Sequence, residues 1–153
     1  EKLGRGAEVL NLSRRGDTAG AAWNYWEDKV KSGEWTQEAG WRPELIIVLL
    51  GGNDILQQRS AEELESDLRT WAEALNRTNA QVLFIPVPGA LFNGSYSGIW
   101  RRVAREYGFA WMTNDTLRRI FTSPKMTIMD HIHLSQKGHQ FLAEQVHYRI
   151  TGK

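Results

Sequence analysis

Two short apolar runs separated by an amphipathic stretch constrain the fold of this chain more than any other feature. Residues 45–50 read LIIVLL, and residues 81–87 read QVLFIPV. Each run has the length and boundaries of a strand that is buried on both faces of a parallel sheet. Parallel strands need a long crossover connection, which is usually a helix. The pattern therefore predicts a β–α–β unit.

The stretch between the two runs carries strong helix signals. Ser60 and Glu63 have the spacing of a capping box, which marks the start of a helix. Apolar residues then recur at helical spacing and form one stripe: Leu64, Leu68, Trp71 and Leu75. A helix is therefore predicted directly after Ser60.

Further strands and helices are predicted along the rest of the chain. Short strands are expected at residues 9–12 and 109–112. Helices are expected after Thr18, which would be the N-cap, over residues 99–107 with Gly108 after the end, over residues 115–121, and from about Ser135 onward. Alternating strands and helices are typical of an α/β fold with a parallel sheet. We expect residues 1–153 to form a single domain.

The bulk composition excludes several function classes. The 153 residues include 24% charged residues and carry a formal net charge of +1, which argues against charge-driven binding of nucleic acid. Cysteine is absent from the sequence, so disulfides and thiolate metal sites are excluded. The longest apolar run, Leu45 to Leu50, is too short to span a membrane, and no stable membrane insertion is expected.

Three polar stretches follow predicted strands or precede predicted helices, at residues 16–18, 51–54 and 130–133. Ligands of open α/β sheets bind at the carboxyl ends of the strands. In the second stretch, Gly51 and Gly52 allow a sharp turn, and Asn53 could aim its amide at an oxyanion. The alternative is that Asn53 serves the turn and that Asp54 starts a short helix.

Asp130 and His133 have the residue types of an acid–base pair. The carboxylate would fix the imidazole tautomer, and the imidazole would accept the proton of a nucleophile. The alternative is a turn-capping aspartate beside a surface histidine. His131 and His133 could together chelate a metal, but no further ligand cluster supports a metal site, and none is predicted. His139 and His147 are interpreted as residues of the last helix.

The motifs taken together resemble the SGNH (GDSL) hydrolase superfamily, in the style of its small bacterial esterases, thioesterases and lysophospholipases. The third block of that family, Gly-x-Asn-Asp, resembles residues 51–54. The fifth block, Asp-x-x-His followed by Leu-Ser and Gly-His, resembles residues 130–139. The second block, a glycine after a strand, resembles residues 9–20, in which Gly16 would be that glycine. The resemblance implies a three-layer, flavodoxin-like fold with a parallel sheet.

The resemblance also implies the roles of the residues. His133 would be the general base and acid, and Asp130 would orient it. The Gly16 N–H and the Asn53 side chain would form the oxyanion hole. Gly52, Pro88 and Phe92 would contact the substrate, which would be a small ester, a lipid or an acylated carbohydrate. No cofactor or metal and no nucleic acid partner is implied, and a periplasmic or secreted location is favoured.

The first block of the family, Gly-Asp-Ser after a strand, does not occur in these residues. Ser13, Thr18, Ser95 and Ser97 are weak substitutes. We expect the nucleophilic serine and the first, central strand to lie upstream, and residues 1–153 to be inactive alone. Alternatives are an SGNH-type O-acetyltransferase or deacetylase acting on carbohydrate, or a non-catalytic binding domain that has lost the nucleophile.

Overall fold

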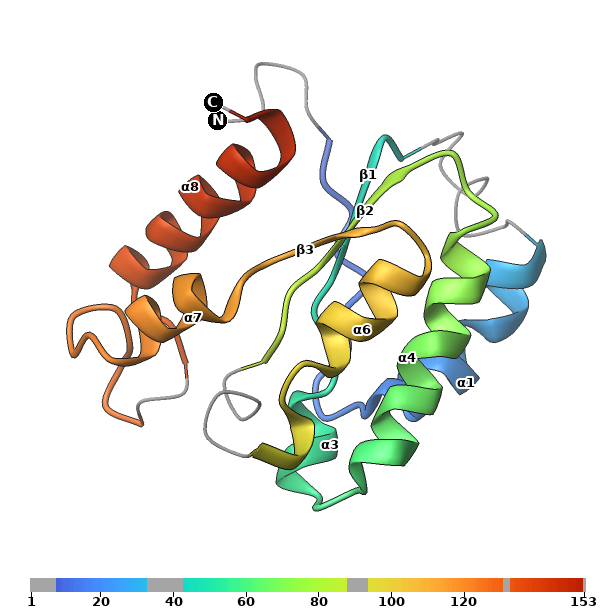
Figure 1. Ribbon diagram of the computed structural model, residues 1–153, viewed down its shortest axis with the longest axis horizontal. Coiled ribbons are helices and arrows are strands. Elements are labelled where there is room, and N and C mark those ends of the chain that lie inside the picture. The colour runs from blue at the N-terminus through green and yellow to red at the C-terminus, as the bar shows by residue number, and fades with distance from the viewer. Residues whose placement is uncertain (1–7, 33–42, 88–93, 131–132, 153) are drawn as a thin grey trace. The chain divides into compact units, whose positions relative to one another are not determined.

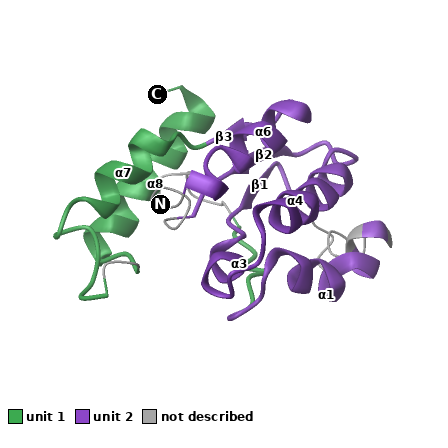
Figure 2. Cartoon of the chain, turned by 60° about the horizontal axis from the view of Figure 1, so that its bottom comes forward, with its two compact units in different colours: residues 1–14, 112–153 green, residues 15–111 purple. Residues whose placement is uncertain are grey.

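The computed structural model describes residues 8–32, 43–87, 94–130 and 133–152. The chain divides into two compact units, one of residues 15–111 and one of residues 1–14 with 112–153 (Figure 2). Each unit is described by itself.

The larger unit contains the parallel sheet that the apolar runs predict. Its strands are β1 (Leu45–Val48), β2 (Gln81–Phe84) and β3 (Ala110–Trp111), in the order β1-β2-β3 (Figure 1). Leu45 pairs with Gln81, and Leu83 pairs with Ala110, both in parallel register. The α/β class with a parallel sheet is confirmed, and the carboxyl ends of β1 and β2 point to the same edge.

Helices of the larger unit follow the predicted pattern. They are α1 (Ala19–Ser32), the short α3 (Gly52–Leu56), α4 (Ala61–Leu75) and α6 (Ile99–Glu106), with one 3₁₀ turn, η1 (Gly94–Tyr96). Both hydrogen bonds of the Ser60–Glu63 capping box are present. In Figure 1, α4 lies between α1 and α6, and α6 packs against β2 and β3.

The core of this unit lies between α4, α6 and the sheet. Its largest side chains are at most 2% exposed: Leu64, Leu68, Leu75, Leu83, Phe84, Ile99, Trp100 and Val103. The predicted stripe of α4 is therefore its buried face. Trp71, at the edge of the stripe, is half-buried and meets Trp23 of α1 edge-to-face at 5.2 Å between ring centroids.

Burial on both faces, which was expected of this run, is wrong for one face of β1 and the residue that follows it. Val48 is 5% exposed, but Ile47 is 46% exposed and Leu49 is 56% exposed. Successive side chains of a strand point to opposite faces of the sheet. The face that carries Val48 is covered, whereas the other face of β1 is left open within the described part of this unit.

The smaller unit contains α7 (Asn114–Phe121) and α8 (Gln136–Thr151), which pack against each other. Thr113 and Ser135 cap their N-termini, and the Arg119 guanidinium lies 5.4 Å from the ring centre of Phe141. The two helices predicted here are confirmed.

The strand predicted at residues 9–12 is wrong. No regular element forms at residues 8–14, and Val9 is 82% exposed. A strand is stabilised by hydrogen bonds to a neighbouring strand and by burial of alternate side chains. Within the described residues this segment has neither, so its apolar composition alone does not produce a strand.

No helix in the described ranges is both long and apolar enough to cross a lipid bilayer.

Candidate active site

The turn after β1 requires glycine at its centre. Gly51 has φ +107°, a conformation that side chains with a Cβ rarely adopt. A Cβ at this position would also lie 2.7 Å from the ring of Trp100. The absence of a side chain therefore lets the chain turn over Trp100 and start α3, which carries Asn53 and Asp54.

Asn53 is tied to the segment that precedes α1. Its Nδ2 donates a hydrogen bond of 2.8 Å to the backbone oxygen of Asp17, 36 residues away in the sequence. Gly16 lies in the turn next to Asp17, with φ +85°. The structure thus brings the two predicted oxyanion-hole positions, Gly16 and Asn53, to neighbouring places in the larger unit.

Thr18 has the capping role that the sequence predicts. Its hydroxyl accepts a hydrogen bond of 3.1 Å from Ala21 N–H, and the residue is only 8% exposed. A buried hydroxyl that caps a helix is a poor candidate for a nucleophile.

Asp54 is fully buried, and both of its carboxylate oxygens accept hydrogen bonds. Oδ2 accepts one of 2.8 Å from Ala19 N–H, at the first residue of α1, and Oδ1 accepts one of 2.6 Å from Arg59. The N-terminus of a helix favours a negative charge, and a buried carboxylate needs such partners. Asp54 is therefore more than the start of α3: it fixes the start of α1.

Arg59 links Asp54 to helix α4. The same Nη1 atom that meets Asp54 also donates to Asp67 Oδ2 at 2.6 Å. These hydrogen bonds, first that to Asp67, raise the pKa of the Arg59 guanidinium above its ordinary value. The cation therefore stays charged and balances two carboxylates.

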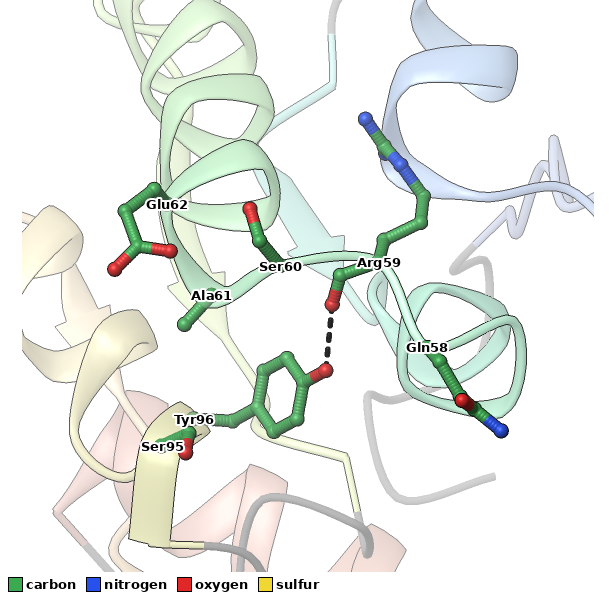
Figure 3. A pocket seen from close by; sticks show the side chains of 7 residues that line it. All are labelled: Gln58, Arg59, Ser60, Ala61, Glu62, Ser95 and Tyr96. Atoms are coloured by element: carbon green, nitrogen blue, oxygen red, sulfur yellow. Dashed lines mark hydrogen bonds between the residues drawn. The ribbon is translucent and has the colours of Figure 1, made fainter.

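An open pocket lies beside this arginine (Figure 3), and the residues that line it come from the loop after α3, the start of α4 and η1: Gln58, Arg59, Ser60, Ala61, Glu62, Ser95 and Tyr96. In Figure 3 the Tyr96 hydroxyl points to the backbone of Arg59, to whose carbonyl it donates a hydrogen bond of 2.5 Å. Arg59 is therefore held through its main chain as well as its side chain.

The Asp130–His133 pair lies in the smaller unit. Asp130 Oδ2 is 2.5 Å from His133 Nδ1, and Asp130 Oδ1 accepts a hydrogen bond of 2.9 Å from His133 N–H. Two contacts from one carboxylate fix both the backbone and the ring of the histidine. The His133 side chain is 77% exposed.

The loop that carries this pair is closed by backbone hydrogen bonds. Ile128 N–H donates to His133 O, and Thr127 forms an antiparallel bridge with Leu134. Ser135 caps α8 by accepting from Gly138 N–H at 3.1 Å, and a Cβ on Gly138 would lie 2.0 Å from Met126 O. The Leu-Ser-x-x-Gly part of the motif thus has a structural explanation, because these residues start α8 and let it pack closely against the loop.

Other residues singled out from the sequence have less to do with this geometry. Gly52 is the first residue of α3, and a Cβ there would lie 3.9 Å from Val87. Ser13 is exposed and bonds to Asn11 Oδ1. His139 lies on α8 and is exposed. Pro88, Phe92 and His131 lie outside the described residues. No group of three or more metal-ligating side chains is found in the described ranges.

Sequence reasoning missed Arg59 and Asp67. Asp67 carried a signal, because it lies three residues after Leu64 and four before Trp71, on the apolar side of α4. An acidic residue within an apolar stripe predicts a buried partner of opposite charge. Arg59, directly before the capping box, gave no comparable signal.

The parallel α/β sheet, with polar loops after its strands, defines a class of proteins that bind ligands at the strand ends. Comparison with known families is more specific. The model of the GDSL-like lipase/acylhydrolase family matches residues 1–141, and the chain belongs to that family. The membership predicted from the motifs is confirmed.

One relative is thioesterase 1/protease 1/lysophospholipase L1 of Escherichia coli K12. It is 24% identical over 108 residues, which are 67% of this chain and 51% of that protein. The match therefore spans about half the length of this relative.

Solved structures show the same fold. TesA matches with a TM-score of 0.74 and 22% identity, over 95% of this chain and 78% of that one. EstA, a psychrotrophic esterase from Pseudoalteromonas sp., matches with a TM-score of 0.71 and 16% identity, over 94% and 76%. AlinE4, an SGNH-hydrolase family esterase, matches with a TM-score of 0.65 and 26% identity, over 95% and 76%.

Proposed function

We propose that the protein hydrolyses carboxylic esters by serine-type catalysis. The observation that carries this proposal is the Asp130–His133 pair, in which the carboxylate holds Nδ1 at 2.5 Å on an otherwise exposed imidazole. A histidine held in this way keeps its proton on Nδ1 and offers Nε2 as a base. Membership of a lipase and acylhydrolase family supports the same chemistry.

The proposed reaction has two halves. His133 Nε2 takes the proton of the serine hydroxyl while the serine oxygen attacks the carbonyl carbon of the ester. The tetrahedral oxyanion collapses, the alcohol leaves with the proton from His133, and an acyl-enzyme remains. Water, deprotonated by the same imidazole, then releases the acid and restores the serine. The nucleophile would belong to the family's Gly-Asp-Ser block, which residues 1–153 do not contain.

The oxyanion would be held by the Gly16 N–H and by the Asn53 amide. One hydrogen of Asn53 Nδ2 is used on Asp17 O. An amide nitrogen has two donors, so the second is available for an oxyanion.

Acyl esters and thioesters are the proposed substrates, because the E. coli relative is described as a thioesterase and lysophospholipase. A small ester, the acyl ester of a lipid and an acylated carbohydrate all present an acyl carbonyl to such a site. Gly52 lies at the carboxyl end of β1, near Val87, and is the proposed substrate contact within the described residues.

Turnover of a short-chain p-nitrophenyl ester by the full-length gene product tests the proposal. We expect hydrolysis by the wild type and a loss on the order of a millionfold in His133→Ala, as for removal of a triad histidine in another serine enzyme. His131→Ala and His139→Ala are matched controls that should keep most of the activity. A fluorophosphonate probe followed by peptide mapping identifies the nucleophile.

Three results would contradict the proposal. Loss of activity in His131→Ala with full activity in His133→Ala would overturn the assignment of the base. Labelling at Ser13 would overturn the assignment of the nucleophile to a Gly-Asp-Ser block. A full-length protein that neither turns over esters nor reacts with the probe would favour the non-catalytic binding domain.

A further inference from the structure

We propose that Arg59 and Asp67 form a positioning pair that holds the two halves of the oxyanion hole at a fixed separation. This inference rests on the proposed function, because it assigns a purpose to the Gly16 and Asn53 positions. All the residues that carry it lie in the larger unit.

The first step concerns the position of the pair relative to the site. Asp54 follows Asn53 directly in α3, and its carboxylate is fully buried. Through Ala19 N–H it holds the first residue of α1, three positions after Gly16. The Asp17 carbonyl, next to Gly16, is held by Asn53. The short peptide between Asp17 and Ala19 is therefore fixed at both ends.

The second step concerns the cation that pairs with Asp54. Arg59 Nη1 lies 2.6 Å from Asp54 Oδ1 and 2.6 Å from Asp67 Oδ2. Without that cation, the fully buried Asp54 carboxylate would lose its partner of opposite charge, and an unpaired buried charge is costly. Asp67, on α4, accepts from the same Nη1 atom and so fixes the position of the guanidinium. The pair therefore fixes the direction of the Asp54 carboxylate.

The third step is that α4 also holds the start of α1 directly. Trp71 Nε1 donates a hydrogen bond of 3.0 Å to Ala19 O. A Cβ on Gly20 would lie 2.7 Å from Asp67 Oδ2, so the first turn of α1 sits directly against Asp67. The segment of residues 16–20 is thus held by α3 on one side and by α4 on the other, and Asp67 contributes to both.

Such an arrangement predicts a catalytic effect that a purely stabilising ion pair would not have. Oxyanion donors act only in the transition state, so a small displacement lowers kcat and leaves KM nearly unchanged. We expect Asp67→Asn, which keeps the shape and removes the charge, to lower kcat about tenfold, less than the loss of a whole oxyanion donor. Arg59→Gln should have the same effect, and Arg59→Lys, which keeps a cation, should recover part of the rate.

The matched control is an ion pair on the same helix that does not touch residues 16–20. Arg69 bonds to Glu65 and to Glu106 at 2.7 and 2.9 Å. Arg69→Gln should leave both kcat and KM of the full-length protein unchanged. The comparison separates a positioning effect from a general loss of charge on α4.

A second measurement does not depend on turnover. In ¹⁵N-resolved NMR spectra of the full-length protein, Asp67→Asn should shift the amide signals of Gly16 and Ala19, and Arg69→Gln should leave them in place. Unchanged Gly16 and Ala19 signals in Asp67→Asn would overturn the positioning role, whether or not the protein hydrolyses esters. If Asp67→Asn does not fold, Arg59→Lys provides the same test.

The kinetic arm has its own contradicting outcomes. Shifted signals with unchanged kcat, or a rise in KM alone, would show that the pair does not serve the oxyanion hole. If wild-type protein has no ester turnover, the proposed function fails, and the NMR arm alone decides whether Arg59 and Asp67 hold residues 16–20.

Discussion

The proposed oxyanion region, around Gly16, Asn53 and Asp54, and the Asp130–His133 pair are built in opposite ways. Asn53 and Asp54 bond to partners 36 and 35 residues away, and Asp54 has no exposed surface. Asp130 and His133 are three residues apart, and the His133 side chain is 77% exposed. One region depends on the tertiary structure of its unit, whereas the other is made by a single loop.

This difference teaches where mutations should act. A contact within one loop depends only on the conformation of that loop. Loss of this contact should therefore alter the chemistry more than the stability. A buried carboxylate that joins three segments contributes to the folded state itself, so its loss should alter stability first. The two regions should therefore respond to different measurements.

Among the changes that test this contrast between the two regions, Asp130→Asn should have the largest effect, and it should act on turnover. The amide can donate to Nδ1 and so favours the wrong imidazole tautomer, which should lower kcat on the order of ten-thousandfold, as in another serine enzyme. Steady-state kinetics with a p-nitrophenyl ester near neutral pH measure the effect. The urea midpoint should hardly change. A loss in kcat smaller than about tenfold would mean that the pair is not the acid–base element.

Asp54→Ala is the corresponding change in the buried region. It leaves Ala19 N–H and part of Arg59 without a partner, and we expect it to lower the free energy of unfolding by about 3 kcal/mol. Urea denaturation followed by tryptophan fluorescence measures this. Asp130→Ala is the matched variant and should cost less than about 1 kcal/mol, because its carboxylate is solvent-accessible. Equal losses in the two variants would remove the contrast between the regions.

Asn53→Ala tests the oxyanion role that we propose for a residue next to the buried Asp54. We expect kcat to fall by about a hundredfold to a thousandfold, the usual result of removing one oxyanion donor. Only one hydrogen bond of the fold is lost, so stability should fall by less than about 1.5 kcal/mol. A rise in KM at constant kcat would show that Asn53 binds the ground state of the substrate instead.

Periodicity in the sequence was sufficient to predict much of the fold. The apolar stripe from Leu64 to Leu75 fits the period of a helix and not that of a strand, and the capping box marks where this helix begins. The existence and the start of α4 were therefore predictable from local patterns. The strand expected at residues 9–12 was wrong because apolar composition does not supply a hydrogen-bonded neighbour. The exposure of Ile47 could not be predicted either, since it depends on which elements cover each face of the sheet.

In the candidate site, too, local contacts were predictable from the sequence and long-range contacts were not. The spacing of Asp130 and His133 is local, and the sequence predicts their contact. The bond from Asn53 to Asp17 and the role of Arg59 join segments that are distant in the sequence, and no spacing rule connects them. Only the position of Asp67 within an apolar stripe hinted at this network.

The smallest predicted effect concerns Glu65 of α4, whose ion pairs do not involve Asp54, and it sharpens the comparison by providing a partly exposed reference. Hydrogen bonds, first that from Arg102 and then that from Arg69, lower the pKa of Glu65 below its ordinary value of 4.5. The charged form is therefore favoured by folding. Its contribution is present above the ordinary pKa and is lost as the pH falls through the lower pKa of the folded state.

Glu65→Gln removes this contribution. Because Arg102 is half exposed, the loss at neutral pH should be less than about 1 kcal/mol, and the difference from wild type should shrink as the pH falls below 4.5. Urea denaturation of both proteins across this pH range is the measurement. A loss as large as that of Asp54→Ala would mean that any ion pair on α4 stabilises the unit equally. The buried hydrogen bond from Asp54 to α1 would then contribute no more to the free energy of unfolding than a partly exposed ion pair does.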